Sequence, residues 1–155
     1  MVDAWRGFHG ALTILLNPQF ALSFNGHCEA AFRCYERCLG GTITFMLTWG
    51  DSPHAADAPA DWGAKIYHAT LKVGDIVIMG ADQPADRYDR PKGFELVLPM
   101  DDPLAAERVF QELAEAGTIR MPLQETFWAR RFGVLVDRFG IPWTVNCERG
   151  VPATA

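Results

Sequence analysis

The sequence lacks the features that mark two large classes of protein. It has no tract of consecutive Lys and Arg, and its formal net charge is −5. Affinity for nucleic acid grows with the number of phosphates that cations neutralise, so we expect no nucleic-acid partner. No apolar run approaches the roughly 20 residues that cross a bilayer, so we also expect no membrane-spanning segment.

Cysteine is scarce, and the four residues present do not predict disulfides or a metal site. They are Cys28, Cys34, Cys38 and Cys147. Three of them fall within one predicted helix, where side chains are poorly placed for disulfides, and no CxxC pair exists. We therefore expect half-buried thiols in a reducing cytosol, and a cytoplasmic protein.

Familiar catalytic motifs are also missing. The sequence contains no P-loop, no dinucleotide-binding motif and no nucleophile motif of the triad type. Motifs alone therefore leave open whether the chain is an enzyme. Its 155 residues, 49% hydrophobic and 21% charged, are typical of a soluble globular protein made of one domain or two small packed halves.

Two amphipathic helices stand out. His27 to Leu39 carries an apolar stripe, and two glycines follow it. Asp102 and Pro103 form a cap and first turn for a second apolar stripe, which stops before Gly117.

The two helices belong to a repeated unit. Residues 30–35 align with residues 105–110, and Gly-Thr-Ile follows both helices, at 41–43 and 117–119. A strand candidate precedes each helix and three follow it, at 20–24, 42–49, 65–72 and 76–79, and at 94–98, 118–121, 131–136 and 142–147.

Each half therefore reads as strand, helix and three strands, which predicts an α+β fold of tandem βαβββ modules. The boundaries that we expect are an N-terminal arm (1–17), a first module (18–80), a linker (81–92), a second module (93–148) and a C-terminal tail (149–155). One helix covers only one face of a four-stranded sheet, so the other face must be covered by the second half or by a partner chain. Two such halves can enclose a ligand cavity.

The order of these segments and their amino-acid sequences resemble the PhnB-like branch of the vicinal oxygen chelate superfamily. This superfamily is also called the glyoxalase/bleomycin-resistance/dioxygenase superfamily. The most specific segments are Met-Pro-Leu-Gln-Glu-Thr-Phe-Trp at 121–128 and Asp-Arg-Phe-Gly-Ile-Pro-Trp at 137–143. The resemblance implies curved mixed sheets around a cavity that binds a small molecule. It also implies a homodimer, with the modules paired within one chain or swapped between two.

In metalloenzymes of that superfamily, ligands come from the first and last strands of each module. Carried onto this chain, those positions fall near Ala21, Ile78 or Met79, Glu95 and Thr144. Only Glu95 coordinates a hard cation strongly, whereas a metal centre needs about three such groups. We therefore predict no cofactor and expect the conventional metal site to be lost. The alternative is a divalent metal in a non-standard site on Glu95 and His68.

Glu95 and His68 are the candidate catalytic residues. Glu95 interrupts an apolar strand candidate, where it could be a general base in the cavity or a solvated carboxylate at the sheet rim. His68 lies within a predicted strand, and the resemblance also places a histidine there. It could act as acid, base or ligand, or be a hydrogen-bonded structural residue.

Aromatic and amide side chains are the candidate ligand contacts. Trp128, Trp143, Asn146 and Phe24 fall near the expected cavity, where the aromatic rings could stack on a planar ligand. The alternative for the aromatic residues is core or dimer packing.

Three arginines, Arg130, Arg131 and Arg138, could attract an anion or could be paired with acidic neighbours. Taken together, the sequence favours an uncharacterised homodimer that binds a small organic molecule. The alternatives are a metal-dependent lyase, isomerase or dioxygenase, and a protein that sequesters a drug.

Overall fold

The computed structural model describes residues 19–149, so the predicted N-terminal arm and all of the predicted tail except Arg149 lie outside the described residues. Two α-helices, one short 3-10 helix and eight strands follow one another in the order β1 (Phe20–Phe24), α1 (Cys28–Leu39), β2 (Thr42–Thr48), η1 (Ala55–Asp57), β3 (Ile66–Val73), β4 (Ile76–Asp82), β5 (Leu96–Pro99), α2 (Pro103–Ala114), β6 (Thr118–Gln124), β7 (Ala129–Val136) and β8 (Pro142–Glu148). No helix of the described part is long and apolar enough to cross a membrane.

The strands form two four-stranded sheets with the same topology. The first has the order β1-β4-β3-β2 and the second β5-β8-β7-β6. In each, the strand before the helix pairs in parallel with the last strand of the module, and the other pairs are antiparallel. The prediction of an α+β fold with two βαβββ modules is confirmed. The strand predicted at 94–98 begins instead at Leu96, so Glu95 lies just before β5.

Helix α1 forms because its apolar residues recur on one face. Cys28, Phe32 and Tyr35 are buried at helical spacing; Cys28 and Phe32 pack against Gly80 of the first sheet, and Tyr35 contacts the second module. Gly40 ends the helix in the left-handed conformation, with φ of 69°, which glycine adopts without steric cost.

Helix α2 begins at a complete cap. The Asp102 carboxylate accepts hydrogen bonds from the backbone N–H groups of Leu104 and Ala105, at 3.1 and 3.2 Å. Pro103 occupies the first turn, where a missing N–H costs nothing. Val109, Phe110 and Leu113 then bury their side chains against the second sheet.

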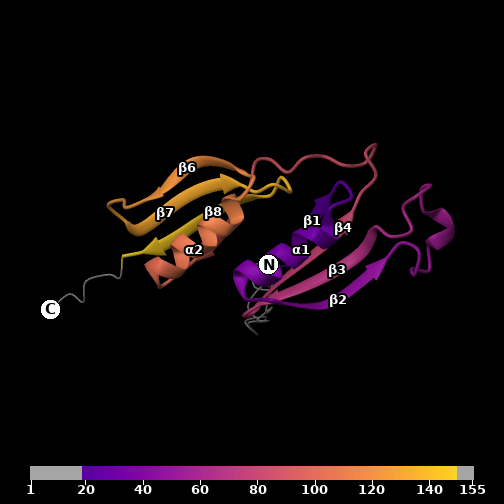
Figure 1. Cartoon of the computed structure of the whole chain (residues 1–155), viewed down its shortest axis with the longest axis horizontal. Helices are drawn as coiled ribbons and strands as arrows, with labels where there is room; N and C mark the ends of the chain where they lie inside the picture. The colour runs from indigo at the N-terminus through magenta and orange to yellow at the C-terminus, as the bar shows by residue number, and fades with distance from the viewer. Residues whose placement is uncertain (1–18, 150–155) are drawn as a thin grey trace, which may run out of the picture.

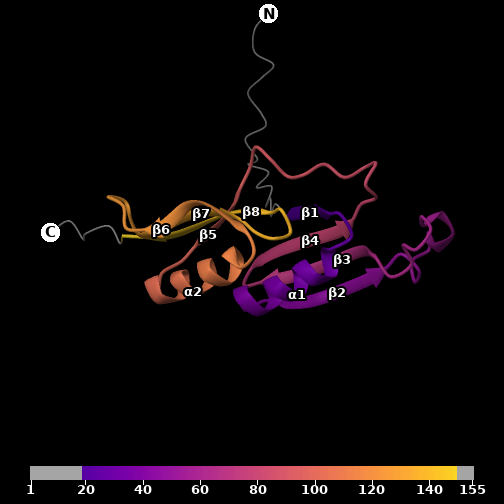
Figure 2. The ribbon, with the colours of Figure 1, turned by 45° about the horizontal axis from the view of Figure 1, so that its top comes forward.

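Both helices lie on the same side of the molecule. Figure 1 shows α1 along the first sheet and α2 along the second, and the two helices also contact each other. In Figure 2 α2 lies below the second sheet and α1 lies below β1 and β4, level with β2, while the segment between β4 and β5 arches above both sheets. Neither module therefore covers the other's helix-free face, which we call the open face.

A buried carboxylate joins the two modules. Asp137, at the end of β7, accepts a hydrogen bond of 2.6 Å from the Tyr35 hydroxyl of α1. The same carboxylate accepts hydrogen bonds from the Trp143 indole N–H and from the backbone N–H groups of Phe139 and Ile141. Tyr35 also contacts Trp143 edge to face, with ring centroids 5.2 Å apart. The modules are thus held together around one fully hydrogen-bonded buried acid.

Candidate functional site

Strand alternation decides which side chains lie on the open face. In β8, Trp143 and Val145 are completely buried on the helix side, so Thr144 and Asn146 point to the other side. Residues opposite each other in a sheet share a face, and Val134 pairs with Thr144 while Phe132 pairs with Asn146. The open face of the second sheet therefore carries Phe132, Val134, Thr144 and Asn146.

Glu95 lies at this face and is held by a side chain of β8. The Thr144 hydroxyl donates a hydrogen bond of 2.5 Å to the Glu95 carboxylate. Glu95 itself is exposed, whereas Thr144 is only 5% exposed. This hydrogen bond orients the carboxylate, and a carboxylate has capacity to accept a further hydrogen bond from a ligand.

Asn146 presents an unused hydrogen-bond acceptor on the same face. Its amide Nδ2 donates to Glu148 at 3.2 Å, but its buried Oδ1 has no partner among the described residues. Burying a polar atom without a partner costs free energy, which a ligand donor would recover. Phe132, opposite Asn146, contacts Trp128 edge to face with ring centroids 5.4 Å apart. The Asn146 acceptor therefore lies on the same face as the aromatic pair of Phe132 and Trp128.

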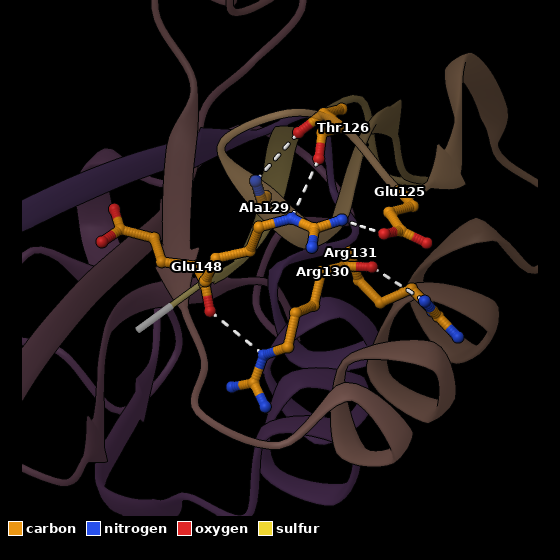
Figure 3. Close-up of polar contacts among 7 residues, drawn as sticks. Glu125, Thr126, Ala129, Arg130, Arg131 and Glu148 are labelled. Carbon is orange, nitrogen blue, oxygen red and sulfur yellow. Dashed lines mark hydrogen bonds and ion pairs between the residues drawn. The ribbon is translucent and has the colours of Figure 1, made fainter. Parts of the chain in front are cut away.

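The turn that carries Trp128 is fixed by polar contacts, as Figure 3 shows. The backbone N–H of Thr126 donates to the Ala129 carbonyl, and the Ala129 N–H donates to the Thr126 hydroxyl, at 2.9 and 3.0 Å. Arg149 donates from Nε to the Thr126 carbonyl at 3.2 Å and forms an ion pair with Glu125. Phe127, next to Trp128, is nevertheless 90% exposed. The turn thus presents two aromatic rings in an ordered conformation.

His68 lies on the open face of the first sheet. Its strand neighbour Ala69 is completely buried under α1, so the imidazole points away from the helix. The His68 Nε2 lies 3.2 Å from the Thr70 hydroxyl. The centroids of the His68 and Phe45 rings are 5.9 Å apart. Glu95 belongs to the second module, whereas β3 lies in the first sheet between β4 and β2. The two candidate catalytic residues thus lie in separate halves of the open surface.

Phe24 and Trp143 lie in the hydrophobic core. Both are completely buried on the helix sides of their sheets, Phe24 beside Phe32 and Trp143 beside Tyr35. A ligand on the open face does not reach either ring, so the site that we describe does not include them.

The four positions that correspond to superfamily metal ligands do not fit a metal centre. On the first sheet, Met79 pairs with Ala21 on the open face, while Ile78 is buried on the helix side. On the second sheet the positions are Glu95 and Thr144, which bond to each other. A thioether, a methyl group and a hydroxyl beside one carboxylate do not provide the imidazole and carboxylate set that Zn or Fe prefers. Among residues 19–149, no group of three or more His, Cys, Asp or Glu side chains could hold a metal ion.

The three arginines singled out in the sequence are all engaged. Arg131 pairs with Glu107 at 2.6 Å, and Arg138 pairs with Glu115 at 3.2 Å. Arg130 donates to the backbone carbonyls of Asp101 and Glu148. These contacts support the alternative in which the three arginines are held by neighbouring residues, and they argue against an anion-binding site formed by them.

Sequence reasoning missed two residues of this region. Phe132 could have been found, because alternation along β7 places it on the face opposite buried Gly133. Arg149 gave no local signal, since its role depends on contact with a turn 23 residues earlier in the chain.

Comparison with known proteins agrees with this architecture. The family model of the Glyoxalase/Bleomycin resistance protein/Dioxygenase superfamily matches residues 19–145. Protein YjdN of Escherichia coli (strain K12) is 34% identical over 139 residues, which cover 84% of this chain and 95% of that protein.

Solved structures show the same likeness. Protein PA1353 from Pseudomonas aeruginosa is 48% identical with a TM-score of 0.79, covering 86% of this chain and 98% of that one. A PhnB protein from Bacillus cereus is 23% identical with a TM-score of 0.73, covering 85% and 99% of the two chains, and shares the fold. The chain is therefore a member of the Glyoxalase/Bleomycin resistance protein/Dioxygenase superfamily, and protein YjdN is one of its relatives.

Proposed function

We propose that this protein is a homodimer that binds a small organic molecule on the open face of its second sheet, without the conventional metal centre of the superfamily. The observation that carries the proposal is the combination of the buried, unpartnered Asn146 Oδ1 with the aromatic wall of Phe132 and Trp128. A ligand that fits is planar and carries an amine, amide or hydroxyl donor. Its ring stacks on Trp128 while its donor reaches Asn146, and Glu95 accepts a second hydrogen bond.

Exposed apolar side chains support the dimer. Phe45 and Val97, on the open faces of the two sheets, are 49% and 55% exposed, and Phe127 at the turn is 90% exposed. Large exposed apolar patches mark interaction sites, and an uncovered sheet face needs a covering layer. Light scattering on a size-exclusion column should give twice the 17.2 kDa mass of the chain. A monomer at micromolar concentration would contradict this part of the proposal.

Ligand binding is tested by screening planar molecules that carry an amine, amide or hydroxyl donor. Isothermal titration calorimetry then gives the dissociation constant of each compound that binds. Replacing Trp128 with Ala should raise the dissociation constant of a true ligand about fivefold or more, because stacking on one aromatic ring contributes about 1 kcal/mol or more. Trp62→Ala is the matched control, since Trp62 lies in the loop between β2 and β3, away from the second sheet. Equal binding by both variants would place the ligand elsewhere.

The loss of the metal centre is tested by elemental analysis. The purified protein is incubated with Zn, Mn, Fe or Ni, desalted and compared with Glu95→Ala. We expect no stoichiometric metal in either protein, because Glu95 has no second strong ligand at the corresponding positions. Stoichiometric metal in the wild type that disappears in the variant would overturn this part and favour Glu95-centred metal catalysis.

A further inference from the structure

A groove of about 340 Å³ lies where the segment between β4 and β5 passes the end of the second sheet. Its walls are Arg90, Pro91 and Lys92 from that segment, and Thr118, Arg120 and Val136 from the sheet. Thr118 and Val136 are cross-strand partners of β6 and β7. A volume above about 300 Å³ is in the range of small-molecule sites.

The groove concentrates positive charge that the described residues do not neutralise. None of Arg90, Lys92 and Arg120 forms an ion pair or a side-chain hydrogen bond with another residue in 19–149. In contrast, Arg131, Arg138 and Arg149 all pair with carboxylates. The whole chain carries a formal charge of −5, so this local excess of cations runs against the overall balance. Three like charges around one groove repel one another, and a bound anion would relieve that repulsion.

The fold holds Arg90 at the edge of the groove. The guanidinium packs on the turn after β7, where its Nε lies 3.6 Å from the position that a Cβ of residue 140 would occupy. Gly140 itself has φ of +89°, a conformation that glycine adopts readily, and the Tyr88 hydroxyl lies at the same distance of 3.6 Å from this position. Arg90 also lines a second groove of about 290 Å³, together with His27 and Arg138.

Asp137, in the turn after β7, does not compete with an anion for the cations of the groove. Both oxygens of the Asp137 carboxylate already accept hydrogen bonds, from Tyr35, Trp143, Phe139 and Ile141. Asp137 is also 5% exposed, so it is not presented to the groove as a free anion.

We propose that this groove binds a small oxyanion with two negative charges, of the kind found in phosphate monoesters and dicarboxylates. The guanidinium groups of Arg90 and Arg120 offer paired N–H donors that match two oxygens each, and Lys92 adds a point charge. The Thr118 hydroxyl supplies one more donor, and Val136 forms an apolar wall. The site shares no residue with the Glu95, Asn146 and Trp128 face, so it stands independently of the proposed function.

Calorimetric titration of the full chain with inorganic phosphate and with malonate tests the proposal, with chloride holding the ionic strength constant. The wild type should bind at least one of the two, more weakly as salt increases. Arg120→Gln should raise that dissociation constant about tenfold or more, because a charged hydrogen bond is lost. Arg87→Gln is the matched control, since Arg87 is exposed in the same segment but does not line the groove, and it should bind within about twofold of the wild type.

Binding of phosphate alone would support a phosphate monoester as the ligand, and binding of malonate alone a dicarboxylate. No binding of either anion by the wild type, or equal affinities of Arg120→Gln and Arg87→Gln, would overturn the proposal. Trp128→Ala should bind the anion normally, which separates this site from the planar-ligand site. Circular dichroism of Arg120→Gln should match the wild type, because Arg120 is exposed.

Discussion

From the hydrogen bond between Tyr35 and Asp137 we predict how Tyr35→Phe changes the free energy of unfolding. Tyr35→Phe removes only the hydroxyl, and the ring keeps its edge-to-face contacts with Trp143 and Phe139. Tyr35 is completely buried and Asp137 is 5% exposed, so water does not replace the lost donor easily. The carboxylate oxygen that accepts from Tyr35 would retain only the Trp143 indole as a donor.

A hydrogen bond to a buried charged group contributes about 1.5–3 kcal/mol. Tyr35→Phe should therefore lower the free energy of unfolding by about that amount. In a chain of this length the change corresponds to a melting temperature lower by about 3–12 °C. Urea denaturation followed by far-UV circular dichroism measures the free energy directly. Because an oligomer's stability depends on concentration, both proteins are compared at the same concentration.

Tyr67→Phe is the matched control. Tyr67 is half-buried, packs edge to face on Trp49, and its hydroxyl forms no hydrogen bond with another described residue. Its loss should change the free energy of unfolding by less than about 0.5 kcal/mol. If Tyr35→Phe cost no more than this control, the contact between the modules would not stabilise the fold and our account of their junction would be refuted.

Two further predictions concern close packing and alkaline pH. A Cβ at residue 80 would lie 2.4 Å from the Phe32 ring, so Gly80→Ala should cost about 1–3 kcal/mol in urea denaturation, while Gly63→Ala, with open space around it, should be nearly neutral. Burial, followed by Asp137, raises the pKa of Tyr35 well above its ordinary value of 10.0, and burial raises the pKa of Cys38 from 9.0 to about 12. Above about pH 9 the folded state thus keeps protons that the unfolded state loses, so the free energy of unfolding should fall as the pH rises from there, and Tyr35→Phe should reduce the slope above pH 10. A stability that stays constant between about pH 8 and pH 11 would be inconsistent with these shifts.

The sequence by itself determined the elements of the fold. Helix stripes, caps and turns are encoded within windows of a few residues, so α1, α2 and the repeated order of strands could be predicted directly. The differences in the strands are at their boundaries, where local patterns carry the least information: β5 starts after Glu95, and β4 and β6 each run three residues further than predicted, to Asp82 and Gln124.

Only the tertiary structure decided which candidate residues share a site. Sequence position could not reveal that Trp143 faces the helix while its neighbour Thr144 faces the open side, because a shift of one residue reverses every side chain of a strand. Nor could it reveal that Glu95 and His68 lie in separate modules, Glu95 just before β5 and His68 within β3.

The junction between the modules shows the same limit. In the sequence, Asp137 is a turn residue before Gly140, and nothing nearby marks it as the acceptor for a tyrosine 102 positions earlier. The basic groove likewise joins Arg90 to Arg120 across the whole of α2. Such contacts arise when the modules pack, because packing brings together residues whose local patterns are independent of each other.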